Sequence, residues 1–192
     1  MFVFSSYPII TAFLGTILLH EALNKKNYVA LLLLVVALTL MFNPANIARY
    51  LIGNLLSFFV GLTWAFYVVG SKVLSRNGNS PIIIGFLSVW IAVITSGIGF
   101  VLFEPLHFHL SMVTLLEVIV FGFLNFTGFT LLNTGFKYVK VSTGAMLLLL
   151  EPIAGSILGF LFFKEIPTVL FICGAILIIV SIYISTTAET QT

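Results

Sequence analysis

The chain contains seven long apolar runs separated by short polar segments. The runs span about 2–19, 28–44, 51–74, 82–103, 113–136, 142–163 and 167–186. A membrane-spanning helix needs about 20 apolar residues, whereas barrel strands are shorter and alternate in polarity. Inside lipid, only helices and closed barrels satisfy all their backbone groups. The sequence therefore predicts an all-α polytopic membrane protein with about seven transmembrane helices.

The composition supports a chain that lies in a lipid bilayer. Only 7% of the 192 residues are charged, 20 are Phe, and the mean hydropathy is +1.23. Soluble domains carry roughly 25% charged residues, so this chain lacks the polar shell that a soluble core needs. The net charge of +2 does not indicate a nucleic-acid partner. A single cysteine, Cys173, excludes an internal disulfide and a cysteine-based metal cluster.

An internal repeat links the two ends of the chain. Residues 8–40 align without a gap with residues 152–184 when the sequence is shifted by 144 positions. The identical pairs include Pro8 with Pro152, Gly15 with Gly159, Glu21 with Glu165 and Leu33 with Leu177. In a membrane protein, such self-similarity is typical of a transporter built from two related halves, whose substrate lies where the halves meet.

Lysine and arginine are divided unevenly between the two predicted membrane faces. One face receives Lys25, Lys26, Lys72, Arg76, Lys137 and Lys140, and the other receives only Arg49 and Lys164. Cytoplasmic loops carry the excess of positive residues. We therefore predict a multi-pass protein of the cell membrane with a cytoplasmic C-terminus, and with the N-terminus of this chain outside the cytoplasm.

Four stretches resemble parts of an EamA-type repeat from the drug/metabolite transporter superfamily. Two are similar to the end of such a repeat: Pro8 through Glu21 to Leu40, and Glu151-Pro152 through Gly159, Lys164-Glu165 and Gly174 to Ile184. The other two resemble the first helix of a second repeat and the opening of its fourth: Asn54 to Asn79, with Trp64-Ala65, and Ser142 to Leu150.

This resemblance implies an inverted-repeat transporter fold of ten helices, of which the chain would hold helices four to ten. Residues 1–44 would be the C-terminal part of the first repeat, 51–186 a complete second repeat, and 187–192 a cytoplasmic tail. The chain would then lack roughly the first three helices. We expect either truncation at the N-terminus or a partner polypeptide that supplies them.

Glu151 is the leading candidate for a substrate- or proton-binding residue, because it lies near the middle of an apolar run. Pro152 cannot donate to the carbonyl of Leu148, so we expect a loosened helix with a free acceptor beside the carboxyl group. The alternative is a protonated Glu151 that bonds a neighbouring helix. Its counterpart in the first repeat is Tyr7, so the two halves would contribute unequally to a central site.

Glycines and prolines are predicted to serve as hinges or packing positions. At about 100° per residue, Gly144, Glu151 and Gly155 share one stripe of a continuous helix, with Gly159 near its edge. Small residues at this spacing let helices approach closely, and pore lining is the alternative. Pro8 and Pro152 are the matching prolines of the two copies.

Four further residues are candidates for contact with a substrate. Asn125 lies near the centre of the fifth run, where an amide needs partners, and a bond between helices is the simpler interpretation. Glu117 lies nearer the outer end of that run and could reach water. Trp64 and Tyr67, one turn apart in mid-helix, predict either an aromatic cavity wall or core packing. His107 and His109 beside Glu104 match a metal site only weakly.

We expect a secondary transporter of small metabolites or drugs, coupled to ions or protons and working as an exporter. Its partners would be the lipid bilayer, a small-molecule substrate, and either a second copy or a complementing N-terminal half. The chain has no HExxH, GxSxG or Walker A motif, and we predict neither an enzyme nor a cofactor. The alternatives are an inactive fragment, a partner-dependent half-transporter, or a seven-helix receptor-like protein, which the repeat disfavours.

Overall fold

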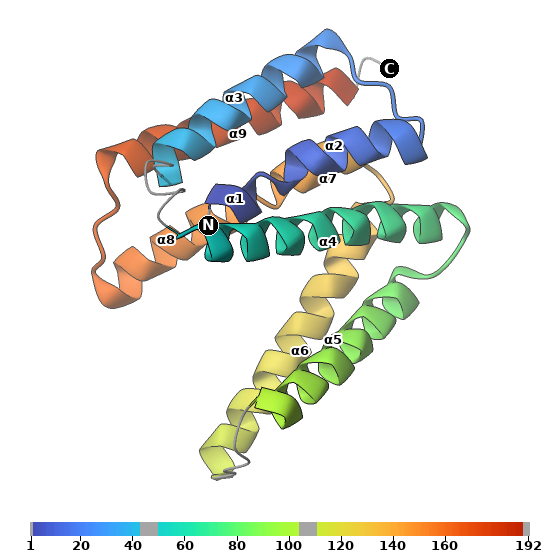
Figure 1. Ribbon diagram of the computed structural model, residues 1–192, viewed down its shortest axis with the longest axis vertical. Helices are drawn as coiled ribbons and strands as arrows, with labels where there is room; N and C mark the ends of the chain where they lie inside the picture. The colour runs from blue at the N-terminus through green and yellow to red at the C-terminus, as the bar shows by residue number, and fades with distance from the viewer. Residues whose placement is uncertain (1, 43–49, 104–110, 190–192) are drawn as a thin grey trace. The chain divides into compact units, whose positions relative to one another are not determined.

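A computed structural model describes residues 2–42, 50–103 and 111–189, which fold into helices joined by short connections (Figure 1). The helices are α1 (Phe2–Ser5), α2 (Tyr7–Leu18), α3 (Lys25–Phe42), α4 (Leu51–Arg76), α5 (Pro81–Phe103), α6 (Met112–Gly135), α7 (Val141–Leu147), α8 (Leu150–Phe163) and α9 (Val169–Glu189). Arg49, Glu104, His107, His109 and the last three residues lie outside the described residues.

The predicted fold class is confirmed. Within the described residues, six helical segments are long and apolar enough to cross a membrane, with Val141–Phe163, which holds α7 and α8, counted as one, and a seventh apolar segment, Val3–Leu18, is shorter. The helix ends fall close to those expected from hydropathy alone. Two predicted helices are interrupted, however. The first is divided at Ser6 into α1 and α2, and the sixth is divided at Leu148 and Leu149 into α7 and α8.

The chain forms two compact units. The first unit comprises Met1–Gly70 and Val139–Thr192, and the second comprises Ser71–Tyr138. The first unit therefore holds both copies of the repeat and most of α4. The second unit holds the last turns of α4 together with α5 and α6.

Helices α3 and α9 of the first unit lie side by side and run antiparallel (Figure 1). Near the start of α9, Gly174 packs against Met41 and the carbonyl of Ala37 in α3. Two turns later, the Ser181 hydroxyl donates to the Ala30 carbonyl at 2.7 Å. The absence of a side chain at Gly174 lets the two backbones approach closely.

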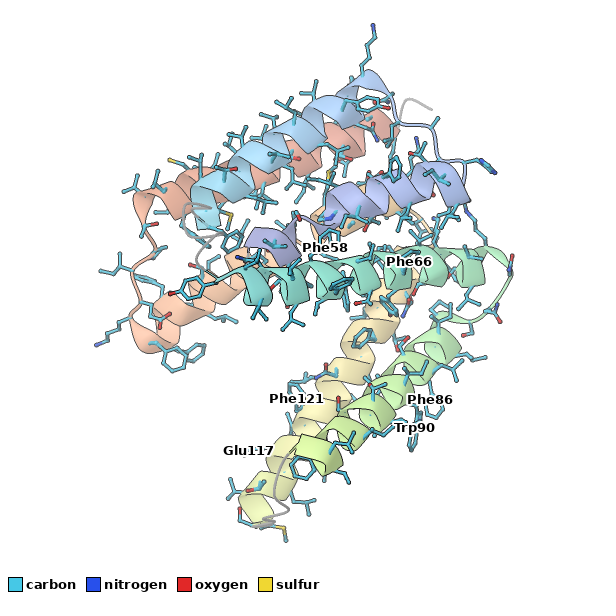
Figure 2. All side chains as sticks on the ribbon, viewed as in Figure 1. Phe58, Phe66, Phe86, Trp90, Glu117 and Phe121 are labelled. Atoms are coloured by element: carbon cyan, nitrogen blue, oxygen red, sulfur yellow. The ribbon has the colours of Figure 1, made fainter. Side chains whose placement is uncertain are left out.

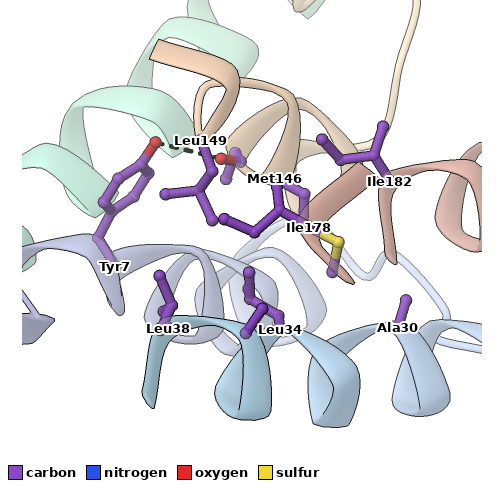
Figure 3. Close-up of a cluster of buried hydrophobic side chains, with 10 residues drawn as sticks. Tyr7, Ala30, Leu34, Leu38, Met146, Leu149, Ile178 and Ile182 are labelled. Carbon is purple, nitrogen blue, oxygen red and sulfur yellow. Dashed lines mark hydrogen bonds between the residues drawn. The ribbon is translucent and has the colours of Figure 1, made fainter. Parts of the chain in front are cut away.

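The hydrophobic core of the first unit lies between this pair and α7. Leu34 and Ile178, which are 144 positions apart, are both fully buried in it (Figure 3). Met146 from α7 and Tyr7 from α2 complete the centre of the cluster. Both copies of the repeat therefore contribute to one core, which places the start of α2 beside α7.

Helices α2 and α7 also pack antiparallel. Gly15 in α2 lies against Val141, the first residue of α7, where an added Cβ would clash with the valine side chain. The carboxylate of Glu21 accepts a hydrogen bond from the Val141 N–H at 2.9 Å and so caps α7. Glu21 precedes α3, which begins at Lys25, so this cap is supplied from the connection between α2 and α3.

The second unit contains a helical hairpin of α5 and α6. Gly85 packs against the backbone and hydroxyl of Thr130, which brings the two helices into contact. The outward faces of the hairpin are apolar, with Phe86, Trp90 and Phe121 more than half exposed (Figure 2). Surfaces of this kind are stable against lipid and not against water. The structure therefore supports the predicted contact with a lipid bilayer.

Candidate functional site

Pro152 divides the sixth predicted helix. Its ring nitrogen carries no hydrogen, so the α-helical ladder stops before it. The Leu149 N–H donates to the Met146 carbonyl at 3.0 Å, and the Glu151 N–H donates to the Leu148 carbonyl at 3.0 Å. The prediction that the Leu148 carbonyl has no donor is therefore wrong, because a tight turn brings the N–H of Glu151, one residue before the proline, to this carbonyl.

The break places Glu151 in the first turn of a new helix, α8. A carboxylate is stabilised there by the partial positive charge of the helix N-terminus. Glu151 is exposed rather than embedded in a continuous helix. The turn at Leu148 and Leu149 is the structural reason why the carboxyl group can reach open space.

Pro8 has the same position in the first copy. It is the second residue of α2, directly after the turn at Ser6. The Ser6 hydroxyl donates to the Val3 carbonyl at 2.7 Å, and the Ile9 N–H donates to the Ser6 carbonyl at 3.1 Å. Both copies therefore contain a helix break just before the matching proline.

A cavity of 490 Å³ lies in the first unit at these two breaks. Its lining is Phe4, Ser5, Tyr7, Trp64, Leu148, Leu149, Glu151, Pro152 and Gly155. Small-molecule sites have volumes of roughly 300–1,000 Å³ and are mostly apolar, with a few polar groups that fix orientation. This cavity fits that description, since Glu151 is the one carboxylate among mainly apolar and aromatic side chains.

Aromatic rings form one wall of the cavity. Gly61 in α4 packs against the Phe4 carbonyl, which brings Trp64, one turn later, beside Tyr7. The rings of Tyr7 and Trp64 are T-shaped, with centroids 6.5 Å apart, and the rings of Trp64 and Tyr67 are tilted by 34°, with centroids 5.2 Å apart. Trp64 lines the cavity, whereas Tyr67 is not among the lining residues and contacts the ring of Trp64.

Tyr7 is held in a fixed orientation. Its side chain is buried, and its hydroxyl donates to the Ala145 carbonyl at 3.1 Å (Figure 3). The Trp64 side chain hydrogen-bonds Tyr7 as well, and Glu151 is close enough to interact with it electrostatically. From the sequence alone, Tyr7 stands out only as the counterpart of Glu151 in the repeat. Tyr7 and Glu151 are 144 positions apart, and this repeat offset was the signal that could have placed the two residues in one site.

The predicted glycine stripe does not exist as one helix face. Gly144 is buried in α7, whereas Gly155 is exposed in α8 and an added Cβ there would meet no atom within 4 Å among the described residues. The stripe assumed a continuous helix, and the turn between α7 and α8 changes its direction. Gly159 instead packs against the carboxylate of Glu165, which follows the end of the same helix.

Asn125 and Glu117 lie on α6, in the second unit. The Asn125 side chain donates to the Phe121 carbonyl of its own helix at 3.0 Å, so the hydrogen bond described there does not link two helices as expected. Glu117 is exposed near the start of α6 (Figure 2). A 400 Å³ cavity in this unit is lined by apolar side chains only, with Phe86, Trp90 and Phe126 among them.

The membrane-length helices, together with a cavity at two broken helices, define a multi-pass helical membrane protein. Residues 51–187 match the EamA-like transporter family. This match covers more than half of the chain, which therefore belongs to the EamA-like transporter family.

A similar protein of Archaeoglobus fulgidus is described as an uncharacterized transporter. The two are 28% identical over 172 residues, which is 88% of this chain and 60% of the relative. The chain thus spans about 60% of the length of the curated relative that it matches. No solved structure matches the chain.

Proposed function

We propose that this chain forms the substrate-binding part of a secondary carrier for small molecules. The observation that carries this proposal is that Tyr7 and Glu151, at the first turns of α2 and α8, line one cavity. Many secondary transporters bind their substrate where discontinuous helices from two related repeats meet near the bilayer midplane. The family and the relative described as a transporter support the same class of function.

The cavity favours a substrate with an apolar body and a cationic group. The ring of Trp64 offers a face for an apolar or cationic group, and Glu151 supplies a negative charge when it is ionised. A single carboxylate can hold a proton or a cation at one time. Exchange of the two at Glu151 would couple proton entry to substrate exit, which supports an exporter driven by protons.

Transport by alternating access requires two related halves that are inserted into the membrane in opposite orientations. The antiparallel pairs α2–α7 and α3–α9 each join one helix from either end of the chain, as repeats inserted in opposite orientations require. We assign residues 1–44 to the first repeat and residues 51–186 to the second. In this assignment the C-terminus lies in the cytoplasm, and the N-terminus of this chain lies outside.

The complete carrier in this proposal contains more helices than the described chain. Its further helices would come from a second copy or from a complementing polypeptide, in keeping with the greater length of the Archaeoglobus relative. The mass of the purified assembly distinguishes these two arrangements.

The test is transport by inside-out membrane vesicles, with a panel of labelled cationic and neutral metabolites and drugs under an imposed proton gradient. We expect Glu151→Gln to lower uptake of the transported compound at least about tenfold, the loss expected when a charged contact is removed. Glu165→Gln is the matched control, because Glu165 is an exposed carboxylate of the same repeat. Undiminished uptake by Glu151→Gln would remove this residue from the mechanism.

Vesicles that contain the unaltered chain provide the baseline. Uptake no greater than that of vesicles without the protein, for every compound, would favour the inactive-fragment alternative. Ligand-dependent signalling without net uptake would favour the receptor-like alternative.

A further inference from the structure

The hydrophobic core of the first unit ends in a layer of polar side chains. Asn27 from α3, Ser142 and Thr143 from α7, and Ser185 from α9 are all buried, and these four residues are called the polar layer. They are not among the residues that line the cavity at Glu151. We propose that the polar layer is a binding site for ordered water, which bridges Asn27 and Ser142 and so joins α3 to α7.

The polar layer continues the buried faces of three helices. On each helix a polar residue lies three or four positions from a residue of the core cluster: Asn27 from Ala30, Ser142 from Met146, and Ser185 from Ile182. Positions three or four apart share one face of an α-helix. The side chains of Asn27, Ser142 and Ser185 therefore lie on the faces that also form the core.

Hydrogen bonds between helices place these residues at one level of the unit. Two bonds fix the register of α3 against α9, from the Ser181 hydroxyl to the Ala30 carbonyl at 2.7 Å and from the Asn24 side-chain amide to the Ala188 carbonyl at 3.3 Å. Asn27 lies halfway between these bonds on α3, and Ser185 lies between them on α9. The Ser185 hydroxyl in turn shares a 2.7 Å hydrogen bond with the Thr143 hydroxyl of α7.

Asn27 and Ser142 carry side-chain atoms that the protein does not satisfy. Asn27 is 0% exposed and Ser142 is 1% exposed. The Asn27 Oδ1 and Nδ2 and the Ser142 Oγ have no hydrogen-bond partner among the described residues. Buried polar groups nearly always have a partner, either in the protein or in an ordered water. The three unpaired atoms therefore indicate a ligand at this end of the core.

The unpaired atoms require a ligand that both donates and accepts hydrogen bonds. The Asn27 Oδ1 can only accept, and its Nδ2 can only donate. A metal cation would satisfy Oδ1 and leave Nδ2 unpaired, whereas an anion would do the reverse. Water satisfies both atoms, and the Ser142 hydroxyl offers a further partner. A buried water typically makes about three such bonds.

The position of the polar layer gives water a short path to it. Asn27 is the third residue of α3, Ser142 is the second residue of α7, and α9 ends four residues after Ser185. The start of α3 and the end of α9 lie at the same end of this helix pair (Figure 1). At 1.5 Å per residue, the polar layer is within about 6 Å of these helix ends along their axes. Water thus needs to pass only about one helical turn.

The bound water would give α7 a third neighbour. Helix α7 packs mainly against α2 and α9. A bridge from Ser142 to Asn27 adds a polar link to α3, at the end of α7 where its first turn begins. Water-mediated hydrogen bonds between protein groups are nearly as favourable as direct ones.

Water-edited solid-state NMR of the full-length chain in lipid bilayers tests the proposal directly. The chain is labelled with 15N-asparagine, and the loss of one signal in Asn27→Leu assigns the Asn27 side-chain amide. Asn133 is the matched control, because it is also 0% exposed but its Nδ2 donates to the Phe129 carbonyl at 2.7 Å. We expect magnetisation from water to reach the Asn27 amide several times faster than the Asn133 amide. Equal or slower transfer to Asn27 would overturn the proposal.

Thermal unfolding of variants gives a second test, in which the sign of the effect decides. Ser142→Ala removes one end of the water bridge and should lower the midpoint by about 2–4 °C. Ser96→Ala, at an exposed position inside α5, is the matched control, because both substitutions gain the same helix propensity. It should leave the midpoint unchanged. If the site is dry, Ser142→Ala removes an unpaired buried group, so an unchanged or raised midpoint would contradict the water bridge.

Asn27→Leu separates the two cases further, since leucine has a similar size and no polar atom. Loss of the bridge should lower the midpoint by more than Ser142→Ala does, whereas removal of unpaired atoms from a dry site would raise it. Replacement of sodium by potassium or N-methylglucamine should leave the midpoint of the unaltered chain unchanged. A sodium-dependent midpoint that Ser142→Ala abolishes would assign the site to a cation and overturn its assignment to water.

Discussion

His20 and Lys164 lie 144 positions apart and share the left-handed backbone conformation, with φ of 54° and 58°. In each copy the next residue closes the same turn. The Glu21 N–H donates to the Gly15 carbonyl at 3.2 Å, and the Glu165 N–H donates to the Gly159 carbonyl at 3.3 Å. In both copies the left-handed residue just before the donor lets the chain fold back onto the end of its helix. The repeated sequence thus ends its two helices in the same way, which supports the proposed pair of related halves.

The left-handed residue predicts a ranked effect on stability at position 164. A side chain in this conformation costs roughly 1–2 kcal/mol, and a β-branched one costs more. We expect the midpoint of thermal unfolding in detergent to be highest for Lys164→Gly, lower for Lys164→Ala and lowest for Lys164→Val. All three variants remove the same charge, so charge is controlled within the series. Identical midpoints would show that this turn does not constrain the fold.

The two matching glutamates are predicted to differ in their contribution to stability. Glu21 is buried and accepts from the Val141 N–H, whereas Glu165 is exposed. Glu21→Ala should lower the free energy of unfolding by about 1–3 kcal/mol, because a buried donor at the start of α7 loses this acceptor. Glu165→Ala should change it by no more than about 0.5 kcal/mol. Chemical denaturation in mixed micelles measures both, and equal losses would contradict the capping role.

Gly174 and Gly155 form another contrasting pair. A Cβ at Gly174 would lie 2.6 Å from the Ala37 carbonyl, whereas a Cβ at Gly155 would meet open space. Gly174→Ala should therefore destabilise the chain by about 1–3 kcal/mol through overpacking of α3 against α9. Gly155→Ala should be neutral or stabilising by up to about 1 kcal/mol, because alanine favours the helix. Thermal unfolding distinguishes them, and a tolerated Gly174→Ala would contradict the close α3–α9 contact.

The Tyr7 hydroxyl is predicted to hold the cavity wall in place. Tyr7→Phe removes its hydrogen bond to the Ala145 carbonyl and should cost about 0.5–1.5 kcal/mol of unfolding free energy. Tyr183→Phe, at an exposed position on α9, is the matched control and should have no effect. A change in tryptophan fluorescence in the Tyr7 variant alone would report on the neighbouring Trp64. The role of the hydroxyl would be refuted by equal stabilities and equal spectra.

The helices could be predicted from the sequence because lipid leaves the backbone few choices. A long apolar run must form a helix to satisfy its own amides, so hydropathy located α3, α4, α5 and α9 closely. The breaks were harder to predict. Pro152 indicated a weakened helix, but hydropathy does not distinguish a loosened helix from a complete turn at Leu148 and Leu149. That turn is what invalidated the predicted glycine stripe.

The candidate site was predicted only in part, because side-chain partners far apart in sequence leave no local pattern. Glu151 was identified from its charge alone, and its function stays a prediction. The capping of α7 by Glu21, across 120 positions, could not be read from either segment. Tyr7 could have been selected by pairing each polar residue with its counterpart 144 positions away. That comparison uses the repeat itself rather than hydropathy.

The proposal of inverted halves is tested most directly by finding which side of the membrane each end of the repeats is exposed to. Single cysteines at Lys25 and Lys164, both exposed, are introduced into a Cys173→Ser background. They are then labelled with a membrane-impermeant maleimide, in intact cells and in inside-out vesicles. The inverted arrangement predicts that Lys164→Cys reacts only from outside and Lys25→Cys only from the cytoplasmic side. Labelling of both cysteines from the same compartment would contradict it.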